Sequence, residues 1–130
     1  MASNNPRELK YSAEHEWTRL QGETATIGIT HFAQDSLGDI VYLSLPAVGA
    51  SVKQFQKMGE VESVKAVNDI YSPVSGKVVE RNENALKSPE IINKEPFGNG
   101  WLVKVQLSDP SEMGKLLDAA SYDKLTAGGH

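Results

Sequence analysis

The chain has 130 residues, of which 39% are hydrophobic and 23% charged, proportions that are typical of a single folded domain in water. Its 13 basic and 17 acidic residues give a net charge of −4, which argues against nucleic acid and anionic membranes as partners. It contains no cysteine, so disulfides, thiolate metal sites and cysteine nucleophiles are excluded. Any thiol chemistry must therefore arrive on a cofactor.

The N-terminal residues show no sign of a targeting segment. Residues 1–8 lack the apolar core of a secretory signal, and Glu8 is unlike an organelle transit peptide. No apolar run is long enough to cross a bilayer. We expect a cytoplasmic protein, or one of the mitochondrial matrix if a presequence has been removed. We also expect one domain over residues 9–126, with flexible ends at residues 1–8 and 127–130.

Short strands and one short helix are predicted in the first half of the chain. Ala25, Ile27 and Ile29 alternate with small or polar residues, which predicts a strand with one buried face. Thr30 is a suitable N-cap and Gly38 a suitable C-terminal residue for a helix over the seven or so positions between them. Further strands are expected at residues 9–11, 17–20 and 39–45.

A hairpin occupies the middle of the chain. Residues 59–64 and 67–74 are rich in β-branched residues and predict two strands, with Lys65 at the tip between them. Pro73 and Gly76 then mark a second turn that folds the next strand back. On spacing alone, Lys65 is an ordinary solvated surface charge.

The last third of the chain is predicted to hold two strands, a loop and a helix. The strands lie at residues 77–81 and 101–107, and the loop between them is rich in Pro, Gly and Asn. A capping pattern that begins at Asp109 predicts a C-terminal helix over residues 110–119, followed by a short turn at 121–125. Many short strands with few helices favour a small β-sandwich or barrel.

The stretch around Lys65 resembles the attachment site of lipoyl and biotinyl carrier domains, in which a modified lysine sits at a hairpin tip. The sequence of this stretch is most similar to that of the H-protein family of the glycine cleavage system. The similarity lies in Glu62-Ser63-Val64-Lys65-Ala66, followed by Ser72-Pro73-Val74-Ser75-Gly76. Further matching segments are Tyr11 with Glu14-His15-Glu16-Trp17, the region from Ile27 to Gly49, and the region from Ile91 to Leu102. The resemblance extends from Tyr11 to Tyr122.

The neighbours of Lys65 distinguish between the carrier families. Biotin carriers resemble one another in the methionines that flank the lysine, whereas Val64 and Ala66 stand here. Lipoyl domains of 2-oxoacid dehydrogenases usually have an acid immediately before the lysine and a Pro/Ala-rich linker nearby, and this chain has neither. Both comparisons favour the H-protein family.

The resemblance implies a fold and a cofactor. The fold would be mainly β, a lipoyl-type hybrid of barrel and sandwich, with a short internal helix and a C-terminal helix. Lys65 would carry lipoate in amide linkage, and the attachment motif around it would consist of Glu62, Ser63, Val64 and Ala66. Within this motif, Glu62 and Ser63 would help the attaching enzyme to recognise the tip, or would only shape the turn. The chain would be a substrate shuttle rather than an enzyme, and its residues show no catalytic arrangement or metal-ligand spacing.

The resemblance also implies partners in glycine catabolism and one-carbon metabolism. The lipoyl arm would accept an aminomethyl group from a pyridoxal-phosphate glycine decarboxylase, the P protein. It would deliver that group to a tetrahydrofolate-dependent aminomethyltransferase, the T protein, and be reoxidised by a flavin dihydrolipoamide dehydrogenase, the L protein. A lipoate-attaching enzyme would modify Lys65 first.

Two acids are candidates to hold the cationic end of the loaded arm in a cleft. Glu16 lies in the opening signature and Asp69 neighbours the base of the arm. The alternative is that both are ordinary surface acids. His15 and His31 are interpreted as structural or exposed.

Two other functions stay open on sequence. One is an interaction scaffold that keeps the fold with an unmodified Lys65, and the other is a relay that passes lipoate to other complexes. The mass of the intact protein after treatment with lipoate and a ligase separates the carrier from the scaffold.

Overall fold

The structure is a computed structural model, and it describes residues 5–128. The predictions of flexible ends therefore fall partly on residues 1–4 and 129–130, which lie outside the described residues. Within the described part, Asn5 donates a hydrogen bond to Asp123, and Arg7 forms an ion pair with the same carboxylate.

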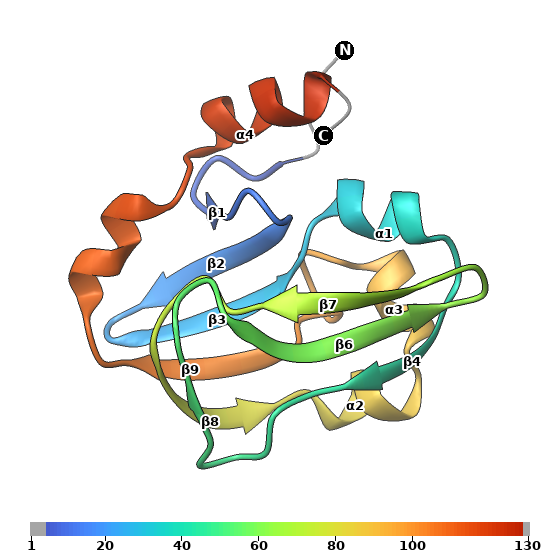
Figure 1. Cartoon of the computed structure of the whole chain (residues 1–130), viewed down its shortest axis with the longest axis horizontal. Coiled ribbons are helices and arrows are strands. Elements are labelled where there is room, and N and C mark those ends of the chain that lie inside the picture. The colour runs from blue at the N-terminus through green and yellow to red at the C-terminus, as the bar shows by residue number, and fades with distance from the viewer. Residues whose placement is uncertain (1–4, 129–130) are drawn as a thin grey trace.

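Two antiparallel sheets form the body of the molecule (Figure 1). The six-stranded sheet has the order β1 (Lys10–Tyr11), β2 (Glu16–Gln21), β3 (Thr24–Ile29), β9 (Val103–Leu107), β8 (Gly76–Arg81) and β5 (Ser51–Val52). The three-stranded sheet has the order β4 (Ile40–Ser44), β6 (Lys57–Ser63) and β7 (Val67–Tyr71). The strands predicted from the sequence are all present, and β5 was missed because two residues show no alternation.

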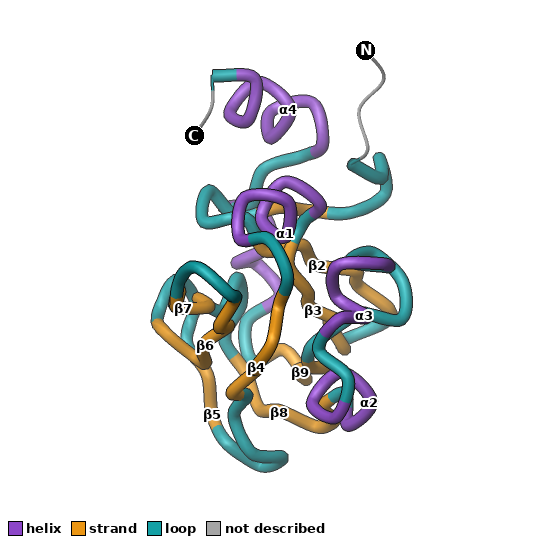
Figure 2. Tube along the Cα trace, turned by 90° about the vertical axis from the view of Figure 1, so that its right-hand side faces the viewer, coloured by secondary structure: helices purple, strands orange, loops and turns teal. Residues whose placement is uncertain are grey.

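The core lies between the sheets and under the short helices (Figure 2). One cluster is built on the inner face of the large sheet, from residues such as Ile27, Val78 and Val105. A second joins both sheets to the helices through residues such as Ile70 and Ile92. Each such side chain contributes roughly 1.5–3 kcal/mol through burial, so the sheets are held together mainly by this contact.

The prediction that β3 has one buried face is wrong. Residues 25–29 are all buried, and the indole of Trp17 in β2 covers Gly28. A Cβ atom on Gly28 would stand 2.6 Å from the indole ring. The indole N–H of Trp17 donates to the Pro96 carbonyl at 2.8 Å, so this fully buried ring keeps a hydrogen-bond partner.

The internal helix is confirmed as α1 (His31–Leu37). The Thr30 hydroxyl accepts the Ala33 N–H, and Gly38 ends the helix with a φ of 80°. The prediction of a loop over residues 82–100 is wrong in part, because α2 (Glu83–Lys87) and α3 (Glu90–Lys94) form there. Asn82 and Pro89 begin these helices, although both residue types also favour loops.

The prediction of one helix over residues 110–119 is wrong in part, although Asp109 caps a helix there as expected. A 3-10 helix, η1 (Pro110–Lys115), ends at Leu116, and Leu117 pairs with Tyr11 through two backbone hydrogen bonds of 2.7 and 2.8 Å. The α-helix begins later, as α4 (Ala119–Ala127), with Asp118 as its N-cap. The pairing with Tyr11 competes with helix continuation, and a local capping pattern does not reveal it.

Candidate functional site

The tip of the β6–β7 hairpin holds Lys65 in a turn that Ser63 organises. The Ser63 hydroxyl accepts the backbone N–H groups of Lys65 and Ala66 at 3.2 and 3.1 Å, and the Ser63 N–H donates to the Ala66 carbonyl at 2.8 Å. Ser63 itself is buried, whereas Val64, Lys65 and Ala66 are exposed. Ser63 therefore shapes the turn from beneath and leaves the lysine accessible.

Two further contacts seat the tip against the rest of the molecule. The Val64 N–H donates to the Asp39 carbonyl at 3.0 Å, which ties the tip to the segment that enters β4. The Lys65 side chain lies over Gly38, so that a Cβ atom on Gly38 would stand 3.4 Å from Lys65 Cε. The origin of the lysine side chain is thus fixed beside the end of α1.

A groove of about 230 Å³ lies between α1 and the β6–β7 hairpin. Figure 1 shows α1 in cyan alongside the green hairpin, with the tip at the right. Phe32 and Leu37 of α1 and Val61 and Ile70 of the hairpin give the groove apolar walls. Ala66, next to Lys65, is also part of its lining, so the groove begins at the tip.

Glu16 is a buried acid in the lining of this groove, with 2% of its surface exposed. The Ser12 hydroxyl donates to Oε1 of Glu16, and the Tyr71 N–H donates to Oε2 at 3.1 Å. Burial raises the pKa of Glu16 from 4.5 to about 8, against the lowering effect of these two donors. Glu16 is therefore not an ordinary surface acid, because its burial favours the neutral form of the carboxyl.

Asp69 lines the same groove from its outer edge. Its carboxylate lies 3.2 Å from the ammonium of Lys57 and has an exposed fraction of 41%. The structure thus brings the two predicted acids to one groove. Glu16 is buried there, whereas Asp69 is exposed and forms an ion pair with Lys57 at the surface.

A hydroxyl from the C-terminal helix links His15 in the groove wall to Thr30 at the start of α1, and no sequence pattern predicts this contact. Tyr122 OH lies 2.7 Å from His15 Nδ1 and 2.7 Å from the hydroxyl of Thr30, the N-cap of α1. His15 lines the groove with a φ of 76° and packs against Phe32, with 4.8 Å between ring centroids. The contacts span 92 and 107 sequence positions, so local patterns cannot reveal them.

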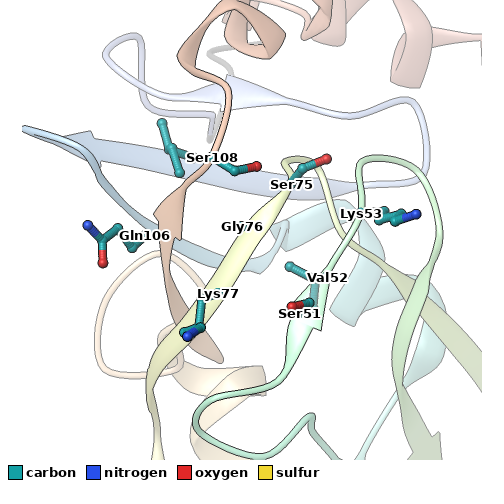
Figure 3. Close-up of a pocket in the computed structure, with 9 residues that line it drawn as sticks. Ser51, Val52, Lys53, Ser75, Gly76, Lys77, Gln106 and Ser108 are labelled. Atoms are coloured by element: carbon teal, nitrogen blue, oxygen red, sulfur yellow. The ribbon is translucent and has the colours of Figure 1, made fainter.

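A larger hollow of about 510 Å³ lies where β5, β8 and β9 meet (Figure 3). Its lining contains Lys53 and Lys77, whose side chains project in different directions, and no acid. Lys65 does not belong to it. Its groups do not converge on a common point, so we do not assign it a site.

Two sheets that present a lysine at a rigid hairpin tip define a lipoyl-type carrier domain. The family model described as Glycine cleavage H-protein matches residues 9–128. The chain therefore belongs to the glycine cleavage H-protein family, and as such it is a lipoyl carrier subunit of the glycine cleavage system and not an enzyme.

Individual relatives agree with this assignment. The chain is 54% identical over 127 residues to the glycine cleavage system H protein of Symbiobacterium thermophilum, covering 98% of this chain and 99% of the relative. It is 50% identical over 121 residues to that of Bacillus subtilis, covering 93% and 95%. A crystal structure of the H protein from Mycobacterium marinum superposes with a TM-score of 0.88 at 38% identity, covering 95% and 99%.

The family and the solved relative confirm the predicted mainly β, lipoyl-type fold. Among residues 5–128, none of the helices has the length and apolar character needed to span a membrane.

Proposed function

We propose that lipoate is attached to Lys65 as an amide and that the resulting arm carries an aminomethyl group between the enzymes of the glycine cleavage system. The observation that supports this most strongly is the placement of an exposed lysine at the mouth of a groove that contains a desolvated acid. A surface lysine alone would not require such a groove.

The residues present suit the group. When bound, lipoate supplies a disulfide that can be reduced and can accept a one-carbon fragment, chemistry that a chain without cysteine lacks. The Ser63 turn keeps the origin of the arm fixed, so tethering raises the local concentration of its far end at a docked partner. The apolar walls between α1 and β7 can accept the hydrocarbon part of the arm.

Glu16 is placed to hold the amine at the end of a loaded arm. A cation beside this carboxyl lowers its pKa and ionises it, and the interaction between the charges is strong because the site is largely removed from water. Asp69 adds a second negative charge at the groove edge, shared with Lys57. Seating the amine in the groove also shields the loaded group from water.

The proposed cycle has three partners after attachment. Glycine decarboxylase loads the arm, the folate-dependent aminomethyltransferase unloads it, and dihydrolipoamide dehydrogenase restores the disulfide. The family supports this order in general, and the bacterial sources of the relatives favour the cytoplasm as the location.

The mass of the intact chain tests the attachment site. The purified protein is incubated with lipoate, ATP and a lipoate–protein ligase, and we expect the mass to rise by one lipoyl group. Lys65→Arg is expected to abolish the rise, and Lys77→Arg, at another exposed lysine, is expected to leave it intact. A parent chain that gains no mass would favour the unmodified scaffold, and a gain that persists in Lys65→Arg would move the site elsewhere.

A further inference from the structure

One asparagine of the chain stands directly before a glycine, in the turn between α3 and β9. Of the seven asparagines, only Asn99 has this neighbour, Gly100. Asn99 is exposed and Gly100 is buried. The pair is chemically reactive, because the backbone nitrogen of Gly100 can attack the side-chain amide carbon of Asn99 and a glycine has no side chain to obstruct the attack.

The packing of this turn requires glycine at position 100. A Cβ atom there would stand 2.7 Å from the carbonyl oxygen of Glu95, 2.9 Å from Cα of Ile92 and 3.0 Å from the carbonyl oxygen of Ile91. All three are backbone atoms in or at the end of α3, so they cannot move aside as a flexible side chain does. The fold therefore keeps the reactive pair, because a bulkier residue that would slow the reaction does not fit.

We propose that Asn99 is a site of spontaneous deamidation, and that Glu95 restrains the reaction while the chain is folded. In the first step the Gly100 nitrogen gives its proton to solvent and forms a bond to Cγ of Asn99. The bond from Cγ to Nδ2 breaks, and this nitrogen takes up a proton from solvent and leaves as ammonia. The product is a cyclic imide, which one water molecule opens to aspartate or, by attack at the other carbonyl, to isoaspartate.

Glu95 holds both reacting groups. Its carbonyl oxygen accepts the Gly100 N–H at 2.9 Å, and its Oε1 accepts a hydrogen bond from Nδ2 of Asn99 at 3.2 Å. The Gly100 nitrogen must lose this proton and turn toward Cγ before it can attack, so both hydrogen bonds have to break. The carbonyl of Asn99 is held as well, by Nδ2 of Asn82 at 2.8 Å. The reaction therefore requires local opening of residues 95–100.

Deamidation would remove contacts that hold three elements together. A carboxylate in place of the Asn99 amide would face the Glu95 carboxylate instead of donating to it. Isoaspartate would also add a methylene to the backbone and displace the carbonyl that Asn82 holds. Asn82 donates to the Trp101 carbonyl too, and its Oδ1 caps α2 at the Ala85 N–H. We therefore expect the modification to loosen the connection between α2, α3 and β9.

Peptide mapping of aged protein by mass spectrometry tests the reactive pair. The chain is kept at mildly alkaline pH, in buffer and in unfolding concentrations of urea, and deamidation is followed at each asparagine. In urea we expect Asn99 to react about tenfold or more faster than Asn84, an exposed asparagine that precedes Ala85. In buffer we expect Asn99 to react about tenfold or more slowly than in urea, because opening costs free energy. Isoaspartate at position 99, detected with an isoaspartyl methyltransferase, identifies the imide route.

Variants of two exposed acids test the restraint. Glu95→Ala removes the acceptor of the Asn99 amide, and we expect deamidation in buffer to become about threefold or more faster. Glu95→Gln keeps an acceptor oxygen and should retain the parental rate, and Glu90→Ala, in α3, is the matched control. Equal rates at Asn99 and Asn84 in urea would overturn the reactive site. Equal rates in buffer and urea, or an unchanged rate in Glu95→Ala, would overturn the restraint, and neither outcome affects the proposed attachment of lipoate.

Discussion

The groove between α1 and the β6–β7 hairpin and the hollow where β5, β8 and β9 meet differ in size and also in the residues that line them. The larger one, where β5, β8 and β9 meet, is lined by serines, by apolar residues such as Val52, and by two lysines that point in different directions (Figure 3). The smaller one, between α1 and β7, contains a buried acid and begins beside an exposed lysine. The comparison favours the smaller groove as the candidate site, because a buried acid and an exposed lysine lie together there although the other hollow is larger.

The largest effect is expected from removing the acid of the smaller groove. Glu16→Gln keeps the shape of the side chain but cannot become negative, so a cationic arm end loses its partner. Loss of one member of a buried charge pair costs about 3–5 kcal/mol, and we therefore expect loss of the aminomethyl group to water to be at least about a hundredfold faster. Ammonia release from the isolated, loaded protein measures this rate.

Lys77→Gln, in the larger hollow, is the matched control for that experiment. It also removes a charge, yet we expect the loaded protein to lose its group at the parental rate. Equal rates in Glu16→Gln and the parent would remove Glu16 from the proposed role.

The pH dependence of folding is expected to carry a second signature of the same acid. The folded-state pKa of Glu16, about 8, lies above its ordinary value of 4.5, so the folded chain keeps a proton that the unfolded chain releases. The free energy of unfolding should therefore fall as pH rises from about 4.5 to about 8, by about 1.4 kcal/mol for each pKa unit of separation. Glu16→Gln should lack this slope, and urea unfolding of both proteins across the range tests the difference.

Removing the Tyr122 hydroxyl of α4 should lower stability modestly and change the surroundings of His15 in the wall of the smaller groove. Tyr122→Phe keeps the stacking on Tyr11, with 4.7 Å between ring centroids, but breaks the contacts to His15 and Thr30. We expect a loss of about 0.5–1.5 kcal/mol in unfolding free energy and a changed Nδ1 resonance of His15 in nitrogen NMR spectra. Unchanged His15 signals would show that the hydroxyl does not hold this ring.

The smallest effect is expected at the larger hollow. Lys53→Ala combined with Lys77→Ala changes two exposed side chains, and the unfolding free energy should stay within about 0.5 kcal/mol of the parent. Lipoate attachment, followed by intact mass, should keep its rate. A large loss of attachment would give the larger hollow a role that its geometry does not suggest.

The sequence predicted those parts of the fold that depend on local signals. Thr30 and Gly38 bound a helix by capping chemistry, and alternation located the strands. It failed where a distant partner decides the outcome. Leu117 leaves the predicted helix because Tyr11 pairs with it, and the indole of Trp17 covers Gly28 in β3.

The candidate site also has some features that local sequence signals predict and others that depend on the folded chain. The hairpin tip at Lys65 follows from local turn signals, and Glu16 and Asp69 were named as candidates from sequence. Their surroundings were not predictable, because the burial of Glu16 depends on Ser12 and on Tyr71, 55 positions away. The contact of Tyr122 with the groove wall also depends on the folded chain. The exposure of both Val41 and Tyr42 depends on the bulge in β4, which alternation alone does not predict.

Titration of Glu16 tests the central claim most directly. Carboxyl carbon NMR of the lipoylated protein, with the Glu16 signal assigned from its absence in Glu16→Gln, follows this one group. We expect a pKa of about 8 in the unloaded protein and a value below neutrality once the arm carries the aminomethyl group. A pKa that stays at about 8 after loading would show that the cationic end does not reach this acid, and would contradict the account.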